Sequence, residues 1–273
     1  MSRAALVSAL LTDLLAESAD LDARVADLPA PAWLTPTPAA GWDIRDTVTH
    51  LHQTDLDALL ALSDPDGFAE FIERVRAAES DPGQLGHVEA SVAAGRTADP
   101  LQLLGDWRAG RERLVAALGA APEGARVPWF GPPMSVPSFI TARLMETWAH
   151  GQDIVDALGQ TRQASPRLRH VAEIGVRARP FAYAVNGLEM PAAAVHVELQ
   201  APGGEVWTWG PNDAADTVSG TALDFCLLVT QRRHRDDIKL AVSGADAAQW
   251  MAIAQAYAGA AGGGRERLDG TGG

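Results

Sequence analysis

Residues 138–158, SFITARLMETWAHGQDIVDAL, have the apolar periodicity and the length of one long helix. Gly159 follows directly, and a glycine just after the last periodic residue is typical of a helix end. The preceding stretch, VPWFGPPMSVP at residues 127–137, is rich in helix-breaking residues. The pattern therefore predicts a separate helix that begins near residue 138 and ends near residue 158.

Three earlier segments have the same helical periodicity. The first lies in residues 1–21, where leucines recur at the spacing of an amphipathic helix. Residues 29–40 contain four prolines and must be a connection, after which Asp43 is a candidate N-cap of a second helix. A third helix is predicted over residues 101–118. Together these helices predict a four-helix bundle over residues 1–160.

The second half of the chain has a different pattern. Residues 194–200 and 205–209 alternate like strands around a glycine-containing turn, which predicts a β-hairpin. Further strands are predicted at residues 215–218 and 238–242, and helices at residues 221–231 and 245–257. Residues 161–258 are therefore predicted as a smaller α+β domain, and the glycine-rich residues 259–273 as a flexible tail. The fold class predicted for the whole chain is α+β.

Composition and charge exclude several classes of protein. The chain has 273 residues, of which 47% are hydrophobic and 21% are charged, which is typical of globular proteins. Its net charge of -13 argues against nucleic acid and anionic membranes as partners. No apolar run is long enough to span a membrane, and the N-terminus does not resemble a signal peptide. One cysteine is consistent with a reducing compartment, so we expect a cytoplasmic protein.

The predicted helix at residues 138–158 carries a stripe of ionisable side chains. Glu146, His150 and Asp153 stand at i, i+4 and i+7, and Arg143 lies one turn before Glu146. A carboxylate and an imidazole at this spacing can bind one metal ion in a helical bundle. A third ligand must come from another element, and His50 in the second helix is the natural candidate.

Spacing leaves other interpretations open. A glutamate and a histidine at i, i+4 are often an exposed hydrogen-bonded pair, and a lone histidine is more often half-buried and hydrogen-bonded than a ligand. Cys226 lies in an apolar run and is predicted to be an unreactive core residue. The sequence contains no G-x-S-x-G element, phosphate loop or dinucleotide fingerprint. Any thiol chemistry at this site would therefore need a thiol from outside the chain.

Two segments resemble a known family. The sequence GWDIRDTVTHL at residues 41–51, followed by METWAHGQD at residues 145–153, resembles the DinB-like superfamily of mycothiol-dependent maleylpyruvate isomerases. The likeness is to an actinobacterial metal-binding branch, in which a DinB-like bundle precedes a domain similar to sterol carrier proteins. The resemblance implies that His50, Glu146 and His150 bind a metal ion, expected to be zinc or another divalent metal.

The resemblance also implies a cofactor and further site residues. Three protein ligands leave an open position on zinc, and the family suggests that the thiol of mycothiol binds there. Asp153 matches an acid one turn after the last histidine, and Arg143 is a candidate for binding the cofactor. In this family an arginine of the second domain reaches the active site, which suggests Arg232 or Arg233 as catalytic or cofactor-binding residues. The alternative interpretation is that these arginines have no role in the site and are solvated cations at the C-terminal end of a helix.

The expected function is that of an isomerase or S-transferase. Metal-activated mycothiol would add to an electrophilic small metabolite, which we expect to be an anion, and the adduct would give either cis-trans isomerisation or thiol transfer. Two alternatives remain. The chain could be a carrier of lipid or acyl groups with a silent metal site, or a metal-dependent hydrolase that needs no thiol.

Overall fold

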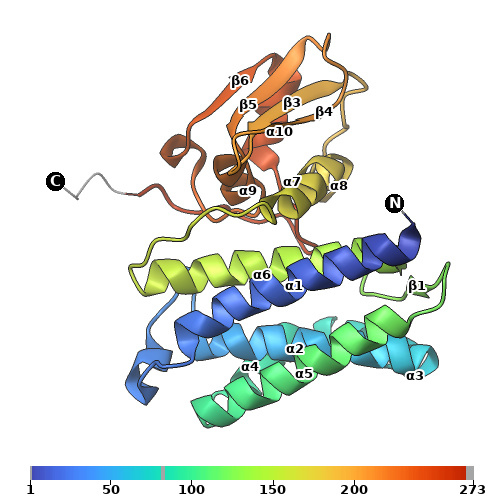
Figure 1. Ribbon diagram of the computed structural model, residues 1–273, viewed down its shortest axis with the longest axis vertical. Coiled ribbons are helices and arrows are strands. Elements are labelled where there is room, and N and C mark those ends of the chain that lie inside the picture. The colour runs from blue at the N-terminus through green and yellow to red at the C-terminus, as the bar shows by residue number, and fades with distance from the viewer. Residues whose placement is uncertain (1, 81–83, 269–273) are drawn as a thin grey trace. The chain divides into compact units, whose positions relative to one another are not determined.

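The computed structural model describes residues 2–80 and 84–268, and the chain divides into two compact units, Met1–Thr161 and Arg162–Gly273. The first unit is mainly helical and the second combines helices with a sheet (Figure 1). This architecture confirms the predicted α+β fold class, with a helical part followed by a smaller part that contains the sheet. No helix in the described ranges is both long and apolar enough to cross a membrane.

The helical unit is built around long helices that lie side by side (Figure 1). Its elements in chain order are α1 (Arg3–Val25), η1 (Ala30–Leu34), α2 (Ile44–Ser63), α3 (Pro65–Glu79), α4 (His87–Gly95), α5 (Pro100–Ala120), β1 (Arg126–Val127), β2 (Met134–Ser135) and α6 (Val136–Ala157). Helix α1 packs against α6, and α2 packs against α5. The core between them is formed by buried residues that include Leu21, Trp33, Val48, Leu51, Leu104, Trp107 and Ile154.

Local signals set the ends of the two helices that carry the polar stripe and His50. At the start of α2, the Asp43 side chain accepts a hydrogen bond from the Asp46 backbone N–H at 2.8 Å, and the Asp46 carboxylate accepts one from Asp43 N–H. At the end of α6, Gly159 has φ of 60°, and Gln160 N–H donates to the Val155 carbonyl. The predicted N-cap and the predicted helix end are both confirmed.

The region between α2 and α5 is more helical than the sequence suggests. Residues 80–100 are rich in glycine, aspartate and serine, yet α4 forms within them and packs against α2. Val92 of α4 is buried. The apolar contact with α2 outweighs the weak local helix signal, because tertiary packing supplies most of the stability of a short helix.

The second unit contains a mixed sheet with helices. Its elements are α7 (Leu168–Arg177), α8 (Arg179–Val185), β3 (Val195–Gln200), β4 (Val206–Trp209), β5 (Asp216–Thr221), α9 (Ala222–Val229), η2 (Arg235–Asp237), β6 (Leu240–Ser243) and α10 (Ala245–Ile253). The strand order is β4-β3-β5-β6, in which β3 pairs antiparallel with β4 and parallel with β5. The predicted hairpin is therefore confirmed, whereas α7 and α8 were not expected from the sequence.

The C-terminal segment lies against the second unit as far as it is described. Residues 259–268 have no regular secondary structure. Gly264 N–H donates to the side-chain oxygen of Gln231 at 3.2 Å, and Leu268 N–H donates to Asp237 at 2.8 Å. The remainder of the predicted flexible tail, residues 269–273, lies outside the described part of the chain.

Candidate metal centre

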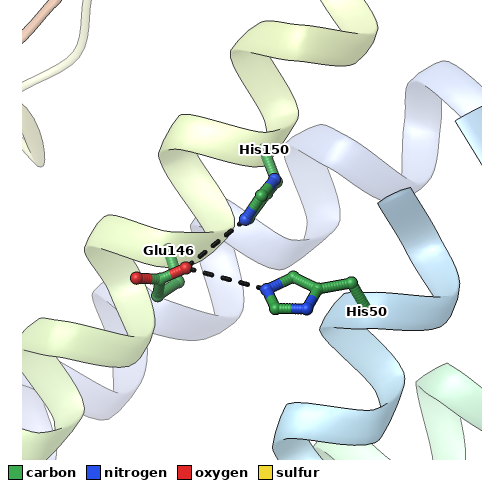
Figure 2. Close-up of side chains that lie close together, drawn as sticks. All are labelled: His50, Glu146 and His150. Atoms are coloured by element: carbon green, nitrogen blue, oxygen red, sulfur yellow. Dashed lines mark ion pairs between the residues drawn. The ribbon is translucent and has the colours of Figure 1, made fainter. Parts of the chain in front are cut away.

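The candidate metal centre consists of His50 from α2 and Glu146 and His150 from α6 (Figure 2). One carboxylate oxygen of Glu146 lies 3.4 Å from His150 Nε2 and 4.0 Å from His50 Nε2. The three potential ligand atoms all lie within 4.8 Å of one another. Ligands of a tetrahedral zinc ion are about 3.4 Å apart, given metal bonds of about 2.0–2.1 Å. The separations and the N, N, O donor set therefore fit a zinc-sized cation.

Two features of the fold bring the three residues together, namely the period of α6 and the packing of α2 against α6. Glu146 and His150 are four residues apart, so α6 alone brings their side chains to one face. His50 reaches them because α2 packs against α6. The predicted set of residues is thus brought together by the fold.

The electrostatic environment favours the metal-binding forms of these side chains. Burial lowers the pKa of His50 from 6.5 to about 4, although the nearby Glu146 opposes this shift. Burial alone would raise the pKa of Glu146, but the neighbouring His150 and His50 outweigh it and hold that pKa well below its ordinary range. Near neutral pH the site therefore contains a neutral His50 imidazole and a Glu146 carboxylate, which are the forms that coordinate metals.

Two neighbours orient the histidine rings. Asp153, which is fully buried, places a carboxylate oxygen 3.4 Å from His150 Nδ1, on the side of the ring away from Glu146. A carboxylate in this position is a common means of orienting a metal-binding histidine. Trp42 stacks on His150, with ring centroids 5.9 Å apart, and its ring centroid lies 5.1 Å from that of His50. The sequence alone does not indicate this role of Trp42, because no spacing rule relates a residue before α2 to a histidine of α6.

Arg143 lies one turn before Glu146 but is bound by α2. Its Nη2 donates to Asp55 at 3.1 Å and to the Thr54 hydroxyl at 2.8 Å, and its side chain is buried. Arg111 of α5 donates to the other oxygen of Asp55 at 2.7 Å. Sequence reasoning missed Asp55 and Arg111. One sequence signal could have indicated them. Asp55 and Arg111 are charged residues that each lie in the middle of a helix predicted to pack in the core.

Arg232 and Arg233 follow α9 in the second unit. Arg232 Nη1 donates to the Thr230 carbonyl at 2.6 Å, and Arg233 Nη1 donates to the Arg232 carbonyl at 2.7 Å. Both contacts match the general interpretation of a cationic helix end. Their catalytic or cofactor-binding roles stay predictions.

Cys226 is a core residue, as predicted. It is fully buried within α9, and burial raises the pKa of its thiol well above the ordinary value. Its sulfur lies 3.5 Å from the Leu168 carbonyl oxygen. A buried thiol with a raised pKa is a poor nucleophile, so the chain's own cysteine is unsuited to thiol chemistry.

Comparisons with known proteins identify relatives of this chain. The family model described as mycothiol maleylpyruvate isomerase N-terminal domain matches residues 14–155, and one described as wyosine base formation matches residues 191–241. Two uncharacterized proteins from two strains of Mycobacterium tuberculosis are each 51% identical over 255 residues, covering 93% of this chain and 97% of each relative.

Solved structures show the same fold. Crystal structures of the mycothiol-dependent maleylpyruvate isomerase and of a mutant form superpose with TM-scores of 0.57 and 0.55, at 16% identity, covering 86% of this chain and 92% of theirs. The first family model spans the bundle helices that carry His50, Glu146 and His150. The chain therefore belongs to the family of the mycothiol maleylpyruvate isomerase N-terminal domain, in agreement with the resemblance in its sequence.

Proposed function

We propose that this protein is a metal-dependent enzyme that uses mycothiol to convert an electrophilic small metabolite, by cis-trans isomerisation or by thiol transfer. The observation that carries the proposal is the cluster of His50, Glu146 and His150, whose ligand atoms lie within 4.8 Å of one another. Membership of the isomerase family supports mycothiol as the thiol, and the buried Cys226 supports a thiol from outside the chain.

In this proposal the chain's own residues bind and orient. His50, Glu146 and His150 would hold a divalent ion, and Asp153 would keep the His150 ring in the orientation that turns Nε2 toward Glu146. Zinc bound there would supply a Lewis acid that favours the thiolate form of a thiol. Three protein ligands leave room for an exogenous one, which is typical of catalytic rather than structural zinc sites.

The cationic residues complete the proposal. Arg143 uses Nη2 to bind Asp55 and Thr54, and its buried Nε has no hydrogen-bond partner among the described residues. In the proposal, Arg143 would use this atom to bind the cofactor. Arg232 or Arg233 would hold a carboxylate of the substrate or cofactor. The substrate class that fits these groups is a small anionic electrophile, such as the maleylpyruvate named for the related isomerase.

Metal content and thiol dependence test the proposal directly. Purified wild-type protein is expected to contain about one equivalent of metal, and His150→Ala to contain almost none, because two remaining ligands bind zinc weakly. His234→Ala is the matched control, since His234 lies outside the cluster. Turnover of maleylpyruvate or a related unsaturated acid is expected only when mycothiol is added.

The same measurements separate the alternatives. Unchanged metal content in His150→Ala would refute the metal site. Turnover that is independent of any thiol would favour a metal-dependent hydrolase over the proposed enzyme.

A further inference from the structure

Asp55 of α2 binds two arginines in the interior of the helical unit. One of its oxygens accepts a hydrogen bond from Arg111 Nε at 2.7 Å, and the other accepts one from Arg143 Nη2 at 3.1 Å. The Asp55 side chain is fully buried, and the two arginine side chains are only 4% and 3% exposed. Interactions between charges are strong where water is excluded, so each partner depends on the others.

This network connects α1, α2, α5 and α6. Arg111 of α5 also donates to the Ser18 hydroxyl of α1 at 3.1 Å and to the Thr147 hydroxyl of α6 at 3.2 Å. Thr147 is the residue after Glu146, and Thr54 donates from its hydroxyl to the carbonyl of His50. The network therefore contacts both helices that supply the proposed metal ligands: Thr147 follows Glu146 directly in the sequence, and Thr54 is hydrogen-bonded to the backbone carbonyl of His50.

Arg143 could pair with either of two carboxylates, Asp55 or Glu146. Arg143 and Glu146 are three residues apart on α6, a spacing at which arginine and glutamate commonly form an ion pair. Here Nη2 of Arg143 is directed to Asp55 and Thr54, whereas Glu146 faces His50 and His150 (Figure 2). A buried guanidinium that loses its carboxylate is strongly destabilised, so it will move to another carboxylate within reach. Glu146 is three residues away on the same helix, which is a spacing that allows an ion pair.

We propose that Asp55 is a positioning residue that holds Arg143 away from Glu146 and so keeps the Glu146 carboxylate available to a metal ion. The inference rests on the proposed metal site and adds to it a residue that does not touch the metal. Removing the charge of Asp55 should release Arg143, which then pairs with Glu146 and competes with metal binding.

The test is a double-mutant cycle read out as zinc affinity. Zinc dissociation constants are measured by competition with a chromogenic chelator for the wild type, Asp55→Asn, Arg143→Gln and the double variant. Asp55→Asn is expected to weaken zinc binding by about 10- to 100-fold, the range typical of residues that support metal ligands. In the Arg143→Gln background the same change should weaken zinc binding by less than about threefold, because the competing cation is absent.

A second readout separates positioning from general stability. Cobalt replaces zinc, and its visible absorption spectrum reports the coordination geometry. The Asp55→Asn spectrum should differ from that of the wild type, whereas the double variant should have the wild-type spectrum. A residue with a merely structural role would lower the melting temperature without this pattern.

Asp57→Asn is the matched control. Asp57 is also a buried carboxylate of α2, but its oxygens accept hydrogen bonds from Gln53 at 2.9 Å and pair with His87 of α4 at 2.9 Å. Because these partners do not include Arg143, zinc affinity should stay within about twofold of the wild type even where stability falls.

Each outcome decides the inference. Equal zinc affinity in the wild type and Asp55→Asn would overturn it while leaving the metal site intact, and so would an equal loss in both Arg143 backgrounds. A wild type that binds no zinc would overturn the proposed function, and this inference with it. If Asp55→Asn does not fold, Thr54→Val removes the other acceptor of Arg143 Nη2. A weakening of about threefold that disappears with Arg143→Gln is then expected, and its absence overturns the inference.

Discussion

Helices α6 and α9 are both largely buried, but they bury different kinds of side chain. Helix α6 buries polar or charged residues on one stretch, namely Arg143, Thr147, His150, Gln152 and Asp153. Helix α9 buries Ala222, Phe225, Cys226, Leu227, Leu228 and Val229. Burying charged groups is costly unless each has a partner. In α6, Arg143 pairs with Asp55 of α2 and Thr147 accepts from Arg111 of α5, whereas His150 pairs with Asp153 of the same helix. The comparison teaches that the buried face of α9 is apolar, whereas α6 combines apolar burial with a buried polar stretch that contains the proposed metal ligand His150.

The largest expected effect comes from removing apolar volume in α9. Phe225 is fully buried and lies against Trp250, with ring centroids 6.2 Å apart. Phe225→Ala should lower the free energy of unfolding of the second unit by about 3–5 kcal/mol, through lost burial and a cavity. Urea unfolding measures this change, and zinc content should stay at the wild-type level. A loss below about 1 kcal/mol would contradict a packing role for this face.

The next effect is a pH dependence of stability caused by His50 in the helical unit. The pKa of His50 is about 4 in the folded protein and 6.5 in the unfolded chain. Between these values protons bind the unfolded chain more readily, so the stability of metal-free protein falls as the pH falls. From pH 7 to pH 5 the expected loss is about 2 kcal/mol.

Urea unfolding of chelator-treated protein at the two pH values measures this loss. His50→Gln is the control and should remove most of the difference, because glutamine does not titrate. An identical pH dependence in wild type and variant would show that His50 is not the responsible group.

Arg232 and Arg233, which follow α9, are proposed to bind an anion at that end of the helix. If Arg232 or Arg233 holds an anion, Arg232→Met or Arg233→Met should raise KM about tenfold, the loss expected for one charge-assisted hydrogen bond, with a smaller change in kcat. Arg235→Met is the control, since Arg235 donates to the Leu240 carbonyl at 2.8 Å. Unchanged kinetics in both variants would leave these arginines as the cationic end of a helix.

The smallest expected effect concerns the side-chain N-cap that α6 and α9 both have. Thr221 caps α9 by accepting from Asp224 N–H at 3.0 Å, and Ser135 caps α6 by accepting from Ser138 N–H at 3.3 Å. Thr221→Val and Ser135→Ala should each lower the free energy of unfolding by about 1 kcal/mol. Thermal unfolding measures both, and neither change should alter zinc affinity. A marked loss of zinc in Ser135→Ala would show that the start of α6 also supports the site.

Much of the fold follows from local patterns, and some of it does not. The long helices of the first unit and the β3-β4 hairpin were predictable because apolar periodicity, caps and turns are local signals. Helix α3, as a separate helix after α2, and helices α4, α7 and α8 were missed. Helix α4 forms where the sequence is weakly helical, because Val92 packs into the unit.

The sequence by itself determined the relation between Glu146, His150 and Asp153, because one helix of known period sets their spacing. It also determined that Cys226 is buried, since the surrounding residues are apolar. Tertiary structure alone decided which side chains meet this stripe. His50, Trp42 and Asp55 reach it from α2 or from the residues before it, and such contacts depend on how two helices pack rather than on the period of either.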